Sequence, residues 1–96
     1  GMDYYWGISA LRVDMVVRLA GAMQQQFDRA PVWSKGLYRA LRYLQRLFPD
    51  QEILIAENGC PERQDGLERL TYIQRHVGEV VRACRHGVPI IGYVCW

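Results

Sequence analysis

The feature that most constrains the fold is a short apolar run, residues 53–56, that leads directly into Glu57, Asn58 and Gly59. The run is too short for a helix of ordinary length, and an Asn-Gly pair is a strong signal for the end of a strand. We therefore expect Glu57 at the carboxyl tip of a strand. Because ligands bind at the carboxyl ends of strands in helix-covered parallel sheets, Glu57 is a candidate for chemistry. The alternatives are a solvated acid or a local cap for the turn that follows.

The rest of the sequence alternates between strand and helix patterns. Aromatic and branched residues predict a strand over residues 3–8, and apolar residues at helical spacing predict helices over residues 10–27, 35–48 and 67–86. Ser34 is the expected N-cap of the second helix, Gly87 is the expected C-terminal cap of the third, and residues 88–94 are the last strand. This order predicts right-handed crossovers and a mainly parallel sheet in a single α/β domain over residues 1–96.

Helical spacing also predicts which side chains face the core. In the first helix these are Leu11, Met15, Val16, Leu19, Met23 and Phe27. In the second helix they are Leu37, Leu41, Leu44 and Phe48, and in the third they are Leu70, Ile73, Val77, Val80, Val81 and Cys84. The last two strands have the continuous apolar runs of strands that are buried on both faces. Helices on both sides of the sheet, a partner chain or further parts of a larger fold are the alternatives for covering them.

The composition favours no strongly charged partner. Twelve basic and ten acidic residues give a net charge of +2, and the basic residues are spread along the 96-residue chain. We therefore expect neither nucleic acid nor a membrane as a partner. No apolar run has the length of a membrane span and the first residues do not resemble a signal peptide, so the expected compartment is the cytoplasm. Gly1 before Met2 is typical of the residue that remains after a purification tag is cleaved.

The cysteines and histidines are not spaced as metal ligands. Cys60, Cys84 and Cys95 are odd in number and far apart, so we expect reduced thiols, no metal and no cofactor. His76 and His86 lie on different faces of the predicted third helix. We expect both histidines to pack in the fold or to lie on its surface.

A larger pattern runs through the last two thirds of the chain. It comprises Trp33, Gly36-Leu37, Leu41 and Leu44, then Ile55-Ala56-Glu57-Asn58-Gly59, then Arg69, Tyr72-Ile73 and His76, and finally Gly87-Val88, Gly92-Tyr93 and Trp96. In order and spacing this pattern resembles the C-terminal third of glycoside hydrolase family 1. The resemblance implies a partial (β/α)8 barrel, to which this chain contributes about three parallel strands and three helices that correspond to the end of the barrel.

The resemblance also implies the residues of a site. In that family the Glu of Glu-Asn-Gly is the nucleophile of a retaining β-glycosidase, so Glu57 would attack the anomeric carbon of a β-glycoside. Tyr5 would correspond to the tyrosine that hydrogen-bonds the nucleophile, with Asp3 in place of a family Asn. Asn58 would bind substrate, and Trp96 would be the platform on which the sugar ring stacks. The alternatives are a half-buried aromatic for Tyr5 and a frayed, tag-adjacent or interface residue for Trp96.

The departures from the family pattern bear on activity. Ala56 replaces the usual Thr, and Asp65 is one residue farther from Arg69 than usual. Retaining hydrolysis needs a second carboxyl roughly 5 to 5.5 Å from the nucleophile, and the family segment that carries this general acid is missing from the sequence; Glu62 is close to Glu57 in sequence but is no evident substitute. We therefore expect the isolated chain to be inactive. The alternatives are a self-associating structural or binding domain, and a complementary chain that completes the barrel.

Overall fold

The chain folds around a small parallel sheet. The computed structural model describes residues 1–5, 17, 18, 20, 23, 31–61 and 67–96. Within them, β1 (Met2–Tyr4), β2 (Ile53–Asn58) and β3 (Ile90–Cys95) form a three-stranded sheet of order β1-β2-β3, and both pairings are parallel. Helices α2 (Ser34–Leu47) and α3 (Leu67–Arg85) precede and follow β2. The predicted parallel α/β order is confirmed for these elements.

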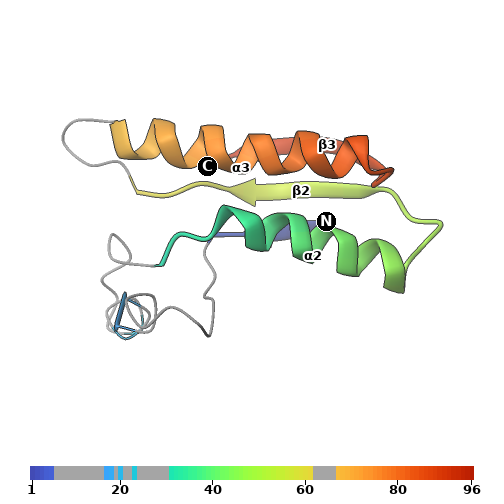
Figure 1. Ribbon diagram of the computed structural model, residues 1–96, viewed down its shortest axis with the longest axis horizontal. Coiled ribbons are helices and arrows are strands. Elements are labelled where there is room, and N and C mark those ends of the chain that lie inside the picture. The colour runs from blue at the N-terminus through green and yellow to red at the C-terminus, as the bar shows by residue number, and fades with distance from the viewer. Residues whose placement is uncertain (6–16, 19, 21–22, 24–30, 62–66) are drawn as a thin grey trace.

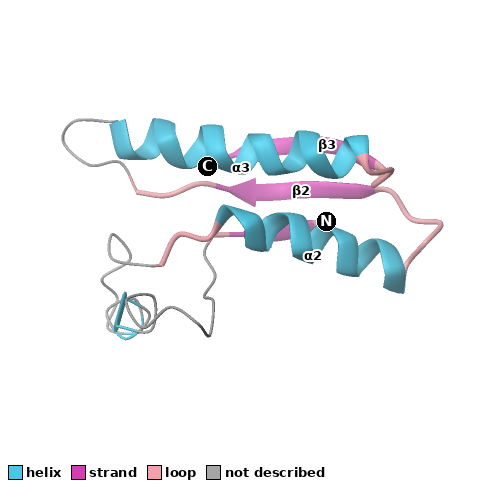
Figure 2. Cartoon of the chain, in the orientation of Figure 1, coloured by secondary structure: helices cyan, strands magenta, loops and turns pink. Residues whose placement is uncertain are grey.

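The two helices lie side by side over one face of the sheet. Figure 1 shows α3 in front of β3 and α2 in front of β1, with β2 between them, and Figure 2 shows the same two layers by element type. The core lies between the layers and comprises Leu37, Leu41, Ile53, Ile55, Val80, Ala83 and Val88. Each large aliphatic side chain buried here contributes about 1.5 to 3 kcal/mol, so this layer contact is the main source of stability. It holds the carboxyl ends of the strands in one place.

Among the described residues the opposite face of the sheet is open, so helices on both sides are not seen, and a partner chain or further parts of a larger fold remain as the alternatives for covering β2 and β3. Leu54 and Val94 are exposed, and Ile91 is 62% exposed. Ile53 and Ile55, the neighbours of Leu54, lie in the core on the helix side, and Tyr93, the neighbour of Val94, packs against it, because successive side chains in a strand alternate between faces. Among the described residues the helices cover one face, so part of each apolar run lies on a surface that these residues leave uncovered.

The start of α2 differs from the predicted cap. Ser34 is the first residue of the helix, Trp33 is the N-cap, and no side chain makes a capping hydrogen bond. The carbonyl of Trp33 instead accepts from the Gly36 amide at 2.9 Å and from the Tyr4 hydroxyl at 2.7 Å. A tertiary contact with β1 therefore fixes this helix end where local capping chemistry predicted a serine. Phe48, predicted in the core, is exposed beyond the helix end.

The buried face of α3 is rotated from the predicted one. The residues that pack inward are Tyr72, His76, Val80 and Ala83, whereas Leu70, Val77, Val81 and Cys84 are exposed. Apolar residues cover more than one face of this helix, so their spacing alone does not fix which arc meets the sheet. The aromatic pair at positions 72 and 76 occupies the contact because both rings reach the strand ends.

The first predicted helix, residues 10–27, falls mostly outside the described residues. Val17, Arg18, Ala20 and Met23 are described, and all are helical and exposed. Met23, predicted in the core, is 78% exposed. Residues 6–8 of the first predicted strand also lie outside the described residues, and β1 itself begins one residue earlier than predicted, at Met2.

The last crossover has the predicted glycine cap. The helix α3 ends at Arg85, and Gly87 has a φ of 86°, a left-handed conformation that glycine adopts without a steric penalty. The Gly87 amide donates to the Cys84 carbonyl, and the Val88 amide donates to the Ala83 carbonyl, both at 3.0 Å. This turn reverses the chain into β3 close behind the helix.

Candidate active site at the strand ends

Glu57 lies at the carboxyl end of the middle strand, as the sequence predicted. It is the second-last residue of β2, pairs with Asp3 of β1, and is half-buried. The strand does not stop at residue 56 as expected, because Asn58 pairs with Tyr4 on one side and Cys95 on the other. Because β1 and β3 both pair with the end of β2, the strand continues past Glu57. The carboxylate is held on the sheet and not on a free loop.

Asn58 is a buried hub that joins all three strand ends to α3. Its Nδ2 donates to the Tyr4 carbonyl at 2.6 Å and to the Tyr72 hydroxyl at 3.1 Å, and its Oδ1 accepts from the Tyr93 hydroxyl at 2.6 Å. The Tyr72 hydroxyl in turn donates to the Tyr5 carbonyl. The side chain of Asn58 has no exposed surface. The geometry gives no support to the prediction that this amide contacts a sugar, since both its hydrogens are engaged within the fold.

The donors and acceptors of this network fix one another. A carbonyl only accepts, so the Asn58 amide nitrogen must face Tyr4 and its oxygen must face Tyr93. Tyr72 donates to Tyr5, so its hydroxyl accepts from Asn58. Reversing the amide would put an oxygen against the Tyr4 carbonyl. The arrangement therefore has one consistent hydrogen-bond direction.

Burial favours the protonated form of the phenols of this region beyond the ordinary preference of tyrosine. It raises the pKa of Tyr4 to about 12 and raises the pKa of Tyr72 above its ordinary value, against a smaller lowering by the hydrogen bond from Asn58. Burial also raises the pKa of Tyr93, although Arg69 acts in the other direction. All three hydroxyls are therefore dependable donors at neutral pH.

Tyr5 and Trp96, both predicted to belong to the site, lie together at the strand ends. Their rings pack edge to face with centroids 5.9 Å apart. The Trp96 amide donates to the Asn58 carbonyl at 2.9 Å, and Arg69 donates to the Trp96 carbonyl at 2.6 Å. The Trp96 side chain is 52% exposed, which leaves surface for a stacking partner. The predicted hydrogen bond from the Tyr5 hydroxyl to Glu57 stays a prediction.

Gly59 allows the close approach of the two strand ends. A Cβ at this position would contact the carbonyl oxygen of Trp96 and lie 2.9 Å from its carbonyl carbon. A side chain cannot move a main-chain group aside as cheaply as it moves another side chain. The glycine after Asn58 is therefore required by the short distance between β2 and the residue that follows β3.

His76 is a buried member of the site region to which the sequence assigned no role. Its ring stacks on Tyr72 at 3.8 Å, and its Nδ1 donates to the Tyr72 carbonyl at 2.7 Å. Among the described residues Nε2 has no hydrogen-bond partner. Burial lowers the pKa of His76, so the ring is neutral at neutral pH. The spacing of Tyr72, His76 and Val80 by four residues was the signal that could have placed them on one helix face.

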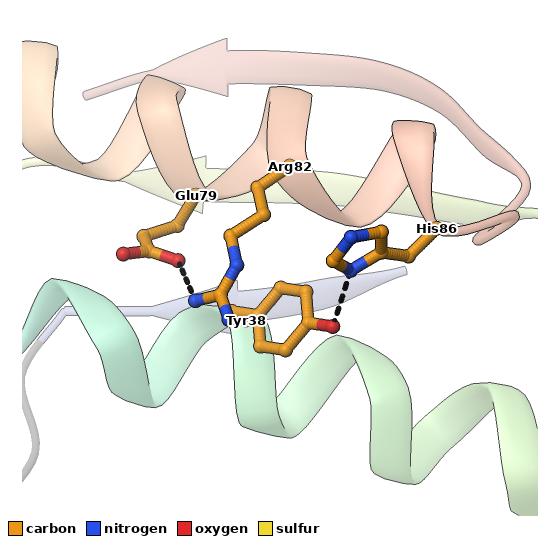
Figure 3. Close-up of polar contacts among 4 residues, drawn as sticks. All are labelled: Tyr38, Glu79, Arg82 and His86. Carbon is orange, nitrogen blue, oxygen red and sulfur yellow. Dashed lines mark hydrogen bonds and ion pairs between the residues drawn. The ribbon is translucent and has the colours of Figure 1, made fainter.

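A second polar cluster holds α2 against α3 away from the strand ends. Figure 3 shows Arg82 over the ring of Tyr38, 4.0 Å from its centroid, with Glu79 hydrogen-bonded to Arg82 at 3.2 Å. The Tyr38 hydroxyl shares a hydrogen bond of 2.6 Å with Nδ1 of His86. A shallow pocket beside it is lined by Tyr38, Arg39, Arg42, Tyr43 and Arg46. This pocket lies on α2 and includes none of the predicted site residues.

The described residues contain no group of three or more side chains arranged to hold a metal ion. Cys84 and Cys95 form no disulfide. Within the same residues, no helix combines the length and apolar character needed to cross a bilayer.

Comparison with known proteins identifies the origin of this arrangement. The chain matches glycosyl hydrolase family 1 over residues 14–96. It is 40% identical over 65 residues to beta-glucosidase 2 of Oryza sativa subsp. japonica, an alignment that takes in 65% of this chain and 13% of the relative. It is 30% identical over 108 aligned positions to beta-glucosidase A of Thermotoga maritima, which takes in all of this chain and 24% of the relative.

A solved structure shows the same fold. The beta-glycosidase of Thermosphaera aggregans superposes with a TM-score of 0.64 and 33% identity, over 70% of this chain and 14% of that protein. The structural neighbours are (β/α)8 enzymes, and this chain corresponds to a part of that barrel. The chain spans a quarter or less of the length of these relatives. By the match over most of its residues, the chain belongs to glycosyl hydrolase family 1.

Proposed function

We propose that this chain carries the nucleophile of a retaining β-glycosidase, and that Glu57 is that nucleophile. The observation that carries the proposal is the position of Glu57 near the tip of the central parallel strand, between β1 and β3, in a chain of this family. A nucleophile has to be held rigidly and aimed at its target, and a strand flanked on both sides provides this.

The proposed chemistry uses residues at all three strand ends. The Glu57 carboxylate attacks the anomeric carbon of a β-glycoside, the glycosidic C–O bond breaks, and a general acid gives its proton to the leaving oxygen. Water then attacks the glycosyl ester, releases the sugar and restores the carboxylate, with its proton returned to the acid. Trp96 offers its exposed ring to the apolar face of the sugar, and Tyr5 is the proposed hydrogen-bond partner of Glu57.

We propose further that the isolated chain does not complete this reaction. General acid catalysis contributes on the order of 10² to 10⁴-fold, and the resemblance implies that the family segment that supplies the acid lies outside this sequence. Asp3, whose backbone lies opposite Glu57, is the described carboxyl that most needs to be tested as a substitute. Hydrolysis then depends on a complementary part of the barrel, in the same protein or in another chain.

Labelling with a 2-deoxy-2-fluoro-β-glucoside tests these proposals, because this reagent traps the glycosyl-enzyme. Mass spectrometry of the isolated chain should show no label. A chimera, in which this chain replaces the matched 24% of beta-glucosidase A from Thermotoga maritima, should be labelled on Glu57. The variant Glu57→Gln of the chimera should lose turnover by on the order of 10⁴-fold or more, while keeping its melting temperature.

Three outcomes contradict the proposal. Label on another residue of a folded chimera, or turnover that Glu57→Gln leaves intact, removes Glu57 as the nucleophile. Efficient labelling or turnover by the isolated chain overturns the proposed inactivity. In that case Asp3→Asn shows whether Asp3 supplies the acid.

A second candidate function is a self-associating structural or binding domain. The observation that favours it is the open sheet face with Leu54, Ile91 and Val94, together with the exposed apolar side chains of α3. Apolar side chains left exposed on a protein surface are commonly part of an interface where they form a patch. Light scattering over a wide concentration range separates the candidates, because a chain that stays monomeric at high concentration is not a self-associating domain. We place the protein in the cytoplasm in either case, and propose no nucleic-acid or membrane partner.

A further inference from the structure

The Asn58 side chain touches every element that meets at the proposed site. It bonds Tyr4 of β1, Tyr72 of α3 and Tyr93 of β3, and its own backbone carbonyl accepts from the amide of Trp96. The next residue toward the N-terminus is Glu57. No other described side chain at the strand ends joins as many elements, and this one is fully buried.

We propose that Asn58 is a positioning residue, whose amide fixes the orientation of the Glu57 carboxylate by locking the tip of β2 between its two neighbours. The proposal rests on the proposed function only in taking Glu57 as the nucleophile. Asn58 acts from inside the fold and makes no contact with the substrate.

The physical reason lies in the alternation of a strand. The side chains of Glu57 and Asn58 leave the same short stretch of backbone, on opposite sides of it. Three hydrogen bonds hold the Asn58 amide on one side of the strand. They prevent the backbone rotation that would move the Glu57 carboxylate on the other side. Because the hydrogen bonds of the Asn58 amide are consistent in only one direction, they hold the end of β2 in a single conformation.

The network also ties Glu57 to Tyr5 and Trp96. The Tyr72 hydroxyl, which accepts from Asn58, donates to the Tyr5 carbonyl, and the Asn58 carbonyl accepts from Trp96. Loss of one hydrogen bond to the Asn58 side chain should therefore disturb the nucleophile and both aromatic residues together. A side chain that stabilised only the core would have no such selective effect.

The test uses the whole chain with its glutamate side chains labelled with ¹³C. The variant Tyr93→Phe removes one bond to the Asn58 Oδ1 and keeps the ring. We expect the Glu57 carboxyl resonance to shift or broaden, and the amide of Trp96 to exchange with solvent about 10-fold faster, since a lost hydrogen bond to a buried partner is worth on the order of that factor. The variant Tyr72→Phe should act on the same resonances.

Two control variants lie outside the network. Gln45→Ala removes another amide hydrogen bond, the one of 2.8 Å from Gln45 Nε2 to the Gly87 carbonyl at the far end of α2. Tyr43→Phe removes a phenol from the exposed surface of α2. Both should leave the Glu57 carboxyl and the Trp96 amide at their wild-type positions, even if Gln45→Ala lowers the melting temperature.

The outcomes are separable from those of the proposed function. If Tyr93→Phe and Tyr72→Phe leave the Glu57 carboxyl and the Trp96 amide unchanged, or change them no more than Gln45→Ala does, Asn58 does not position Glu57. If they change as expected while the chimera is not labelled on Glu57, the coupling stands and the nucleophile assignment fails. If the chimera is labelled but the resonances do not move, only the positioning role is lost.

Discussion

The strand ends and the outer contact between α2 and α3 are both held by tyrosine hydroxyls, yet they are built on opposite principles. At the strand ends the partners are neutral, buried or partly buried, and fixed in direction around Asn58. Between the helices they are Tyr38, His86, Arg82 and Glu79, which are charged or ionisable, and the Arg82 side chain is 50% exposed. Buried neutral networks are costly to break, whereas exposed ion pairs contribute little. The rigid part of the molecule is therefore the part that carries the candidate site.

The largest effect should come from removing the hub itself. Asn58→Ala leaves the Tyr4 carbonyl and the Tyr93 hydroxyl without their partner in a buried region. We expect the free energy of unfolding to fall by about 3 kcal/mol, as two buried polar groups lose their hydrogen bonds. The midpoint of urea unfolding measures this change. A loss no larger than that of Arg82→Ala would remove the contrast between the two regions.

A somewhat smaller effect should follow from closing the gap between β2 and β3. Gly59→Ala places a methyl group against the Trp96 backbone and should lower the free energy of unfolding by about 2 kcal/mol. The matched control is Gly78→Ala on α3, where a Cβ meets nothing within 4 Å. This control should stabilise the chain by about 0.5 to 1 kcal/mol because alanine favours a helix over glycine. Equal shifts of the same sign in thermal melts would contradict the account of Gly59.

The histidines sharpen the comparison through pH. Burial lowers the pKa of His76 below its ordinary value of 6.5, so the unfolded chain binds the proton more readily than the folded chain. The contribution of His76 to stability is complete above about pH 6.5 and is lost as the pH falls from there toward the lowered pKa of the folded state. Melting temperatures at about pH 8 and about pH 5 should therefore differ less in His76→Leu than in the wild type.

The exposed histidine provides the control for that measurement. His86 is exposed and shares its hydrogen bond with Tyr38 at the surface. His86→Gln should keep the wild-type difference in melting temperature between the two pH values. If both variants flatten the pH dependence equally, burial of His76 is not its cause.

The smallest effect should come from the helix contact. Arg82→Ala removes a cation–π contact with Tyr38 and a hydrogen-bonded ion pair with Glu79. We expect a loss of about 0.5 to 1 kcal/mol at low salt, and less at high salt because the charges are exposed. Urea unfolding at the two salt concentrations measures it. An effect that high salt does not reduce would contradict this account, because it would mean that the contacts of Arg82 are shielded from the solvent.

Much of the framework was predictable because it depends on local patterns. The short apolar run before Glu57, the glycine after α3 and the alternation of strands and helices predicted a parallel sheet with an acid at a strand tip. The order of the motifs also predicted the family. These features are written in residues close together in sequence, and chain geometry translates them directly into structure.

The errors came where several arrangements satisfy the same local pattern. Ser34 was a plausible cap, but the contact of Trp33 with Tyr4 fixes the start of α2. Apolar side chains on more than one face of α3 left its rotation open, and the packing of Tyr72 and His76 on the strand ends decided it. The apolar runs of β2 and β3 likewise left open what covers the second face of the sheet, because the length of an apolar run does not say which chain covers it.

By itself the sequence determined that Glu57 lies near the carboxyl end of a strand, because the apolar run leads directly into Glu57 and the Asn-Gly pair marks the end of that strand. Only the tertiary structure decided what surrounds that tip, because the partners of Asn58 come from residues 4, 72 and 93 and meet only when the strands and α3 are packed. A pattern of neighbours can place an acid on a strand, but the hydrogen bonds that hold the strand still are made across the fold.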